Sequence, residues 1–430
     1  MPIYTSWPRI PYRVKSQILE RYCGLPFSLR RIPYYLTWVA VAALPCSITA
    51  MNWALAVGAL ALLVCRWRFG GQLRFPPLLA PLSTFFVCTV LAIASSGHIA
   101  QGFEGVRKFF LFLMLLLVVS TVRSASDARN LVWGVAGVTT LSAAWSLAQF
   151  VRKYQAATAE GVDFRLAYTA GERITGFVGH WMTLSGIEMI VLLLIAGLVL
   201  FSTGRGRWLL LGCGAIIAVS LAAGYTRSMW MGTALGLIYL LWYRDRRWLI
   251  ALPIAAGLLL ALNPAGIGGR IVSIWKPAGD IDSNRFRVIC RRTAVAMIQA
   301  HPWFGVGPGQ VRPRFLEYIP ADIERPLPPG AYIHMHNTYL QFAAERGIPA
   351  LLALLWMLAK MLWDLLGLAR RDPDAWAPRS AIAVAIAVLA AGWYEHNLGN
   401  GQVLPLFLAA VGLGYVSGEE GAVASPDASG

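Results

Sequence analysis

Long apolar stretches without charge recur along almost the whole 430-residue chain, and no other feature constrains the fold as strongly. An α-helix needs about 20 apolar residues to cross the hydrocarbon core of a membrane. Only 13% of the residues are charged, whereas soluble domains contain about 25%. The sequence therefore predicts an all-α polytopic membrane protein and excludes a disordered chain or an ordinary soluble domain.

The apolar stretches predict about twelve transmembrane helices. The uncharged segment Ile32–Cys65 is too long for one helix, and Pro45, Ser47 and Thr49 indicate a break within it. Because the stretch at 228–243 is short, eleven helices is the main alternative. The expected spans lie near residues 33–48, 50–66, 75–97, 105–122, 129–150, 180–202, 207–226, 228–243, 248–263, 348–369, 380–397 and 402–418.

The distribution of basic residues predicts the orientation, because Lys and Arg favour the cytoplasmic loops of membrane proteins. With the N-terminus in the cytoplasm, 19 basic residues fall in short inner segments and 7 in short outer segments. Residues 1–33 carry six basic residues and no cleavage pattern, so we expect a retained cytoplasmic segment. Nine helices then occupy 33–263, a large partly helical outer loop 264–347, three helices 348–418, and a cytoplasmic tail 419–430.

The net charge does not predict nucleic-acid binding, and the spacing of the possible ligands does not predict a metal site. A net charge of +16 is typical of a protein whose loops face anionic headgroups, so membrane lipids are the expected partners. The six cysteines lack metal-ligand spacing, and His334 and His336 have no third ligand at a reliable distance. Asp280 and Asp282 resemble a metal-binding DxD pair, but a turn or helix cap is the preferred interpretation. We therefore expect no metal and no cofactor.

The predicted orientation places every histidine at or near the outer face. Histidine is the usual general acid or base near neutral pH. We therefore expect the chemistry to take place on the outer side of the membrane. The six residues are His98, His180, His301, His334, His336 and His396.

The large outer loop contains one clear helical pattern, at 284–300. Phe286, Ile289, Thr293 and Met297 form an apolar stripe with arginines on both sides, which is typical of a helix lying at a membrane surface. These arginines either contact lipid headgroups or recognise a lipid diphosphate, because the guanidinium fork matches phosphate oxygens. The following segment, 301–309 (HPWFGVGPG), is interpreted as a rigid turn in preference to a phosphate loop.

Several polar residues at the outer boundary are candidates for a site. His336 and Asn337 precede a helical stretch, where a neutral imidazole accepts a hydroxyl proton and an amide binds a sugar or phosphate. Arg227 lies at the outer end of a short span, at the level of Arg173 and His180. Two further residues stand near this boundary. Glu188 is expected to pair with an arginine or to line a cavity, and Glu395 lies in the last outer turn.

Four segments together resemble the O-antigen ligase and polymerase superfamily of bacterial polysaccharide assembly. They are 173–180 (RITGFVGH), 226–232 (TRSMWMG), 284–309 and 336–348 (HNTYLQFAAERGI). The resemblance covers roughly 170–350, and the first five spans match in hydropathy alone. One departure is Arg291, where many members carry an aromatic residue.

The resemblance implies a GT-C-like, inverting glycosyltransferase in the bacterial inner membrane, with a periplasmic active site. The donor would be O-antigen glycan on undecaprenyl diphosphate and the acceptor the lipid A–core oligosaccharide, without metal or nucleotide. By the matching motifs, His336 would act as the base or position the acceptor. Arg227 and either Arg285 or Arg287 would bind the diphosphate. The other candidate residues within the matching segments are Arg173, His180, Asn337 and Glu345, and His334 is a candidate two residues before the last of these segments.

Two other functions are considered. An O-antigen polymerase shares these motifs but joins two carrier-linked glycans, and the short tail after the last span favours the ligase. A transporter for a lipid-linked sugar is expected to show internal repeats and polar groups near the membrane midplane. The sequence has no clear repeat, and its polar residues gather on one face, which favours an enzyme.

Overall fold

The secondary structure of the described residues is all-α, as the sequence predicted. The computed structural model describes residues 27–70, 72–171, 173–204, 206–263, 266, 268–269, 283–327, 332 and 334–423. No strand occurs within these ranges. The α-helices are α2 (Ile32–Ala43), α3 (Ile48–Phe69), α4 (Leu79–Ser96), α5 (Ile99–Arg107), α6 (Leu113–Thr121), α7 (Ala125–Ala159), α8 (Phe164–Ala170), α9 (Trp181–Phe201), α10 (Arg207–Ala223), α11 (Arg227–Arg244), α12 (Ala251–Leu262), α14 (Ser283–Ala300), α15 (Val311–Arg314), α16 (Thr338–Arg371), α17 (Trp376–Ala391) and α18 (Val403–Val423).

Five of these helices, α3, α4, α7, α9 and α16, are long and apolar enough to cross a membrane. Three shorter apolar helices are α10, α17 and the part of α18 at Val403–Val416. Each stretch predicted as a span overlaps a helix, and the break near residue 45 is present between α2 and α3. The membrane character is thus confirmed, while the number of twelve spans and the segment boundaries stay predictions. Most of the predicted N-terminal segment and the end of the tail lie outside the described residues.

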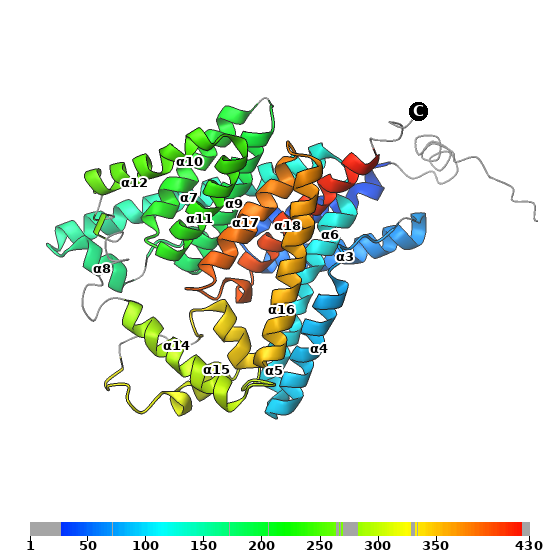
Figure 1. The fold of residues 1–430 in the computed structure, drawn as a ribbon. Coiled ribbons are helices and arrows are strands. Elements are labelled where there is room, and N and C mark those ends of the chain that lie inside the picture. Colours follow the sequence, from blue (N-terminus) through cyan, green and yellow to red (C-terminus); the bar gives the residue numbers. More distant parts are fainter. Residues whose placement is uncertain are drawn as a thin grey trace, which may run out of the picture.

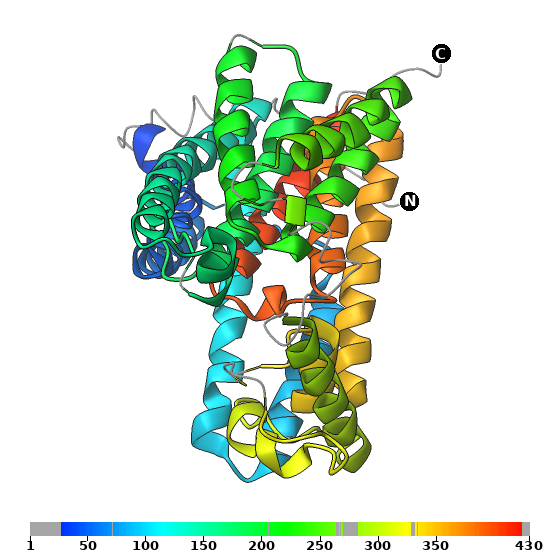
Figure 2. The same ribbon diagram turned by 90° about the vertical axis from the view of Figure 1, so that its left-hand side faces the viewer.

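The helices form a bundle with a smaller region at one end (Figure 1). Helices α7, α9, α10, α11, α17 and α18 belong to the bundle, whereas α4 and α16 run side by side and extend beyond it. Helices α5, α14 and α15 lie at that extended end, as the perpendicular view also shows (Figure 2). The segments between the bundle and this region are therefore positioned to form a site.

Helix α14 is present as predicted, but its apolar stripe does not face a membrane. Ile289, Thr293 and Met297 are buried in a second, smaller core together with Val311 and Phe315. Burial of these side chains by the protein's own chain stabilises the attachment of α14 to the loop that follows it. The interpretation of the stripe as a membrane-surface contact is therefore wrong, because the protein itself covers that face.

The glycine-rich segment 301–309 is a structural turn, as preferred from the sequence. Gly305 adopts a φ of +65°, and the backbone N–H of Val306 donates to the carbonyl of Ala344 at 2.8 Å. The N–H of Gly309 donates to Glu345 Oε1 at 3.3 Å. These donors are used to attach the turn to the first part of α16, not to bind phosphate.

The kink in α16 depends on Gly347, which has a φ of +81°. A Cβ atom at this position would lie 2.1 Å from the carbonyl oxygen of Trp303. Gly347→Ala is expected to destabilise the protein by about 2 kcal/mol or more, because a backbone at φ 81° and ψ 171°, a region almost restricted to glycine, alone costs alanine about 1–3 kcal/mol. The unfolding temperature in detergent measures this loss. Gly367→Ala, in the same helix with no atom within 4 Å, is the control and should be neutral or mildly stabilising. Equal unfolding temperatures for the two variants would contradict the assigned role of Gly347.

Candidate functional site

Three residues from distant parts of the chain meet at the end of the bundle. Glu395 lies after α17, Arg287 lies near the start of α14, and His336 immediately precedes the N-cap of α16. Glu395 Oε1 accepts a hydrogen bond from an Arg287 guanidinium nitrogen at 2.7 Å, and Glu395 Oε2 lies 3.3 Å from His336 Nδ1. Glu395 is only 3% exposed. One buried carboxylate therefore links a guanidinium to an imidazole.

The start of α16 fixes the position of His336. Asn337 is the N-cap, and its Oδ1 accepts a hydrogen bond from the N–H of Leu340 at 2.9 Å. Its Nδ2 donates to the carbonyl of Trp393 at 3.0 Å, which ties the cap to the segment that carries Glu395. Asn337 was a candidate for contacting sugar or phosphate, but these hydrogen bonds hold its side chain inside the protein.

Electrostatics determines the protonation of this group. Burial alone would raise the pKa of Glu395, but the hydrogen bond with His336 and the charge of Arg287 outweigh it and hold the pKa at about 2. The carboxylate is ionised at neutral pH and only accepts hydrogen bonds. His336 Nδ1 must then carry the proton that is donated to Glu395, so in the neutral imidazole Nε2 is the nitrogen with a lone pair.

Three more of the predicted residues surround this group. One Arg173 guanidinium nitrogen donates to the carbonyl of Tyr225 at 3.3 Å. Burial lowers the pKa of Arg173, and the charges of Arg287 and Arg227 act in the same direction. His180 caps α9 through Nδ1, and it lies within electrostatic reach of Arg173 and His336. Arg227 begins α11 and is half-buried. Arg173 and Arg227 therefore add positive charge close to Arg287.

A row of imidazoles continues from His336 through His334 to His396. The ring centroids of His336 and His334 are 4.1 Å apart, and those of His334 and His396 are 6.0 Å apart. Burial and the neighbouring His336 lower the pKa of His334 to about 4, so this ring is neutral at physiological pH. Four of the six predicted histidines are thus gathered at this site, counting His180.

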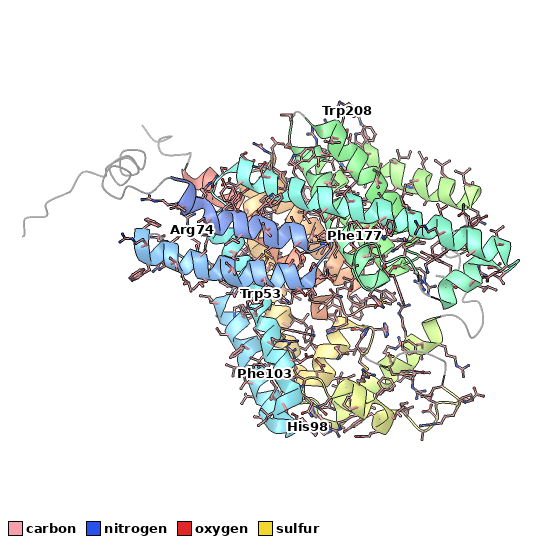
Figure 3. The ribbon with its side chains drawn as sticks, turned by 180° about the vertical axis from the view of Figure 1, so that it is seen from behind. Trp53, Arg74, His98, Phe103, Phe177 and Trp208 are labelled. Carbon is pink, nitrogen blue, oxygen red and sulfur yellow. The ribbon has the colours of Figure 1, made fainter. Side chains whose placement is uncertain are left out.

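Other predicted residues lie outside this group. Arg285 pairs with Glu324 at 3.3 Å on the protein surface, where the two side chains are 41% and 85% exposed. Glu345 holds the turn at 301–309. His301 Nε2 lies 2.7 Å from the hydroxyl of Tyr318. His98 precedes α5 at the far end of the smaller region (Figure 3).

Glu395 was noticed in the sequence as part of the last outer turn but was not selected as a site residue. The sequence feature that could have identified Glu395 is a carboxylate just beyond an apolar span. A charged side chain at such a position costs free energy unless it has a partner. The partners of Glu395 were not predictable because they are distant in sequence, His336 by 59 residues and Arg287 by 108.

Two further expectations concern other polar residues. Glu188 is fully buried and accepts a hydrogen bond from Ser220, and its Oε2 has no hydrogen-bond partner in the described structure. No arginine is among the hydrogen-bond partners of Glu188 in the described structure, so the expected pairing with an arginine is not found. The described residues include no group of three or more His, Cys, Asp or Glu side chains placed to hold a metal ion. Asp280 and Asp282 lie outside the described residues.

One comparison with known proteins matches a segment that contributes residues to this site. Residues 213–355, about a third of the chain, match the family model described as O-antigen ligase. This match supports the assignment of the segment 213–355 to the O-antigen ligase/polymerase family. The matched segment contains Arg227, Arg287 and His336, whereas Glu395 lies beyond it. No curated protein matches the chain. The family comprises membrane ligases and polymerases of the glycosyltransferase kind, whose substrates are lipid-linked sugars and lipid acceptors.

Proposed function

We propose that this protein is an O-antigen ligase that transfers glycan from undecaprenyl diphosphate to the lipid A–core oligosaccharide. In this proposal the protein spans the bacterial inner membrane with a GT-C-like fold, and 264–347 belongs to a periplasmic catalytic loop. The observation that carries the proposal is the orientation of His336. Its Nδ1 is held by the ionised carboxylate of Glu395, which leaves Nε2 as a proton acceptor beside a group of arginines.

The proposed reaction is a single displacement at the anomeric carbon. The acceptor hydroxyl oxygen forms a bond to that carbon, and its proton passes to His336 Nε2. The bond between the same carbon and the diphosphate oxygen breaks, which inverts the anomeric configuration. Glu395 stabilises the imidazolium that results, in the way that a carboxylate supports a catalytic histidine in hydrolases.

Arginine side chains would supply the charge that the leaving group requires. The departing diphosphate is a good leaving group when its negative charge is stabilised by fixed positive groups. Arg287 is paired with Glu395, and Arg173 and Arg227 supply further positive charge in this proposal. Arg285 is assigned no part, because its guanidinium pairs with Glu324 at the surface. Metal and nucleotide have no step in this reaction.

A reconstitution experiment tests the proposal. Purified protein in lipid vesicles, with carrier-linked O-antigen and lipid A–core, is expected to form complete lipopolysaccharide in EDTA without ATP. Gel electrophoresis followed by mass spectrometry would detect the product. An identical reaction without lipid A–core is the control. Longer carrier-linked glycan in that control would identify a polymerase, and absence of any product from the complete mixture would falsify both assignments.

A further inference from the structure

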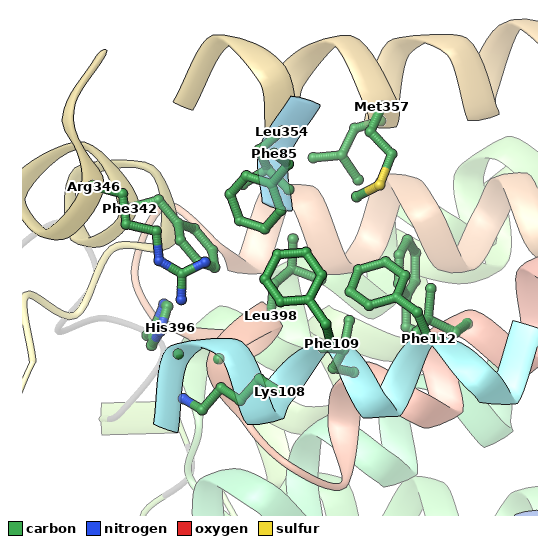
Figure 4. A pocket seen from close by; sticks show the side chains of 16 residues that line it. Phe85, Lys108, Phe109, Phe112, Phe342, Arg346, Leu354, Met357, His396 and Leu398 are labelled. Atoms are coloured by element: carbon green, nitrogen blue, oxygen red, sulfur yellow. The ribbon is translucent and has the colours of Figure 1, made fainter. Parts of the chain in front are cut away.

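A small cationic cavity lies beside the histidine row. It has about 40 Å³ of free space and is bounded by α4, α16, α18 and the 3-10 helix Lys108–Phe112. Figure 4 shows the side chains of Lys108, Arg346 and His396 together at one end of it. The other side chains that line it are apolar, and none of the described residues in its wall is acidic. The cavity therefore presents positive charge without a carboxylate of its own.

Arg346 contributes a buried guanidinium with few hydrogen bonds. It is 4% exposed, and its Cζ lies 5.1 and 4.9 Å from the ring centroids of Phe85 and Phe342. One terminal nitrogen donates to Thr89 Oγ1 at 3.2 Å, whereas Nε has no hydrogen-bond partner among the described residues. Glu345 Oε2 is 3.9 Å from Nε, which is too far for a hydrogen bond. A guanidinium stays charged at physiological pH, so this buried charge is only partly compensated.

Lys108 and His396 share the same end of the cavity. The charges of Lys108 and Arg346 both act on the His396 ring, and the two charges act on each other. His396 Nδ1 is buried and, like Arg346 Nε, has no hydrogen-bond partner in the part of the chain that the structure describes. Two like charges repel one another more strongly in a protein interior than in water. This end of the cavity thus combines two positive charges with two unsatisfied buried nitrogen atoms.

The size of the cavity restricts what can bind there. One water molecule needs about 10–15 Å³ of such space. The cavity, at about 40 Å³, is large enough for one monatomic anion and too small for a lipid chain or a nucleotide. A water molecule satisfies a hydrogen-bond donor but leaves both positive charges uncompensated, whereas an anion does both.

We propose that this cavity is a binding site for a small monovalent anion of the size of chloride, held by Arg346 and Lys108 beside His396. The anion links α16 to the 3-10 helix that begins at Lys108, and Arg346 extends this link to Thr89 on α4. His396 directly follows Glu395, so the anion also supports the segment that holds His336. The site requires no glycan or carrier lipid, and it is therefore independent of the proposed ligase reaction.

Thermal unfolding of the full chain in detergent tests this proposal. Sodium chloride replaces sodium gluconate stepwise at constant ionic strength, because gluconate is too large for the cavity. The unfolding temperature of the wild type is expected to rise with chloride and to reach a plateau, since an anion that binds only the folded state stabilises it by mass action. Broadening of the chloride NMR signal by the protein, reversed by bromide, would detect the binding directly.

Two variants locate the anion. Lys108→Gln should raise the half-saturating chloride concentration about tenfold or more, as expected for the loss of one charge-assisted hydrogen bond. Arg346→Met should abolish the chloride response. Because Arg346 is buried, the exposed Lys108 provides the deciding variant. Arg107→Gln is the matched control and should respond as the wild type does, because the exposed pair of Arg107 with Glu104 lies outside the cavity.

Three outcomes would overturn the proposal. The first is a wild-type unfolding temperature that is the same in chloride and gluconate, as expected if the cavity takes only water. The second is an unchanged chloride response in Lys108→Gln, which would place the anion elsewhere. The third is stabilisation by inorganic pyrophosphate without any effect of chloride, which would assign these cations to a diphosphate. A chloride response that depends on Lys108 would support the site even if the reconstitution formed no lipopolysaccharide.

Discussion

His336→Ala is expected to lower the rate of glycan transfer by about 10²- to 10⁴-fold, the usual contribution of a positioned general base. The substitution removes the only imidazole that Glu395 holds through a hydrogen bond to Nδ1 in the described structure. Initial rates of lipopolysaccharide formation in vesicles measure the effect. Binding of the carrier lipid should be retained, because the arginines are unchanged.

Two variants make this result specific. His98→Ala removes an exposed imidazole at the start of α5 and is expected to leave the rate unchanged. Glu395→Gln keeps the shape of the carboxylate but removes its charge, and should lower the rate and shift its pH profile. A positioned general base usually contributes more than a tenfold increase in rate. If His336→Ala kept more than about a tenth of the wild-type rate, the role of His336 as the base would therefore be refuted.

Arg287→Ala is expected to destabilise the protein by about 3 kcal/mol or more, because it leaves the buried carboxylate of Glu395 without its guanidinium partner. Transfer should fall as well, since Glu395 then no longer holds His336 in a fixed position. Thermal unfolding in detergent, followed by tryptophan fluorescence, measures the loss of stability.

The neighbouring Arg285 provides a matched control. It lies two residues earlier on the same helix, and its pair with Glu324 is exposed, so Arg285→Ala should cost about 0–1 kcal/mol. Equal unfolding temperatures for the two variants would show that the buried pair contributes no more to stability than the surface pair.

The pH dependence follows from the lowered pKa of Glu395. The pKa falls from 4.5 to about 2 on folding, so the stabilisation is complete above about pH 4.5 and is lost as the pH falls towards 2. A shift of this size corresponds to about 3 kcal/mol. Wild type should therefore resist acid to a lower pH than Arg287→Ala, and acid titrations of unfolding compare the two. Coincident acid transitions would contradict the assigned pairing.

The sequence by itself determined the helical membrane character, the helix at α14 and the turn at 301–309. These features depend on the local pattern of residues: apolar stretches of spanning length, a 3.6-residue period and glycines in a sharp turn. The family resemblance followed from motifs that are also local, and its central segment is confirmed at residues 213–355.

Only the tertiary structure decided which residues meet. Arg285 and Arg287 are equivalent in the sequence, but two residues along a helix correspond to a rotation of about 200°, so one side chain pairs at the surface and the other reaches Glu395. The core beneath α14 and the pocket at Arg346 also depend on packing between segments far apart in the chain. A local pattern fixes the direction of a side chain on its own helix, whereas its partner depends on how the helices pack against one another.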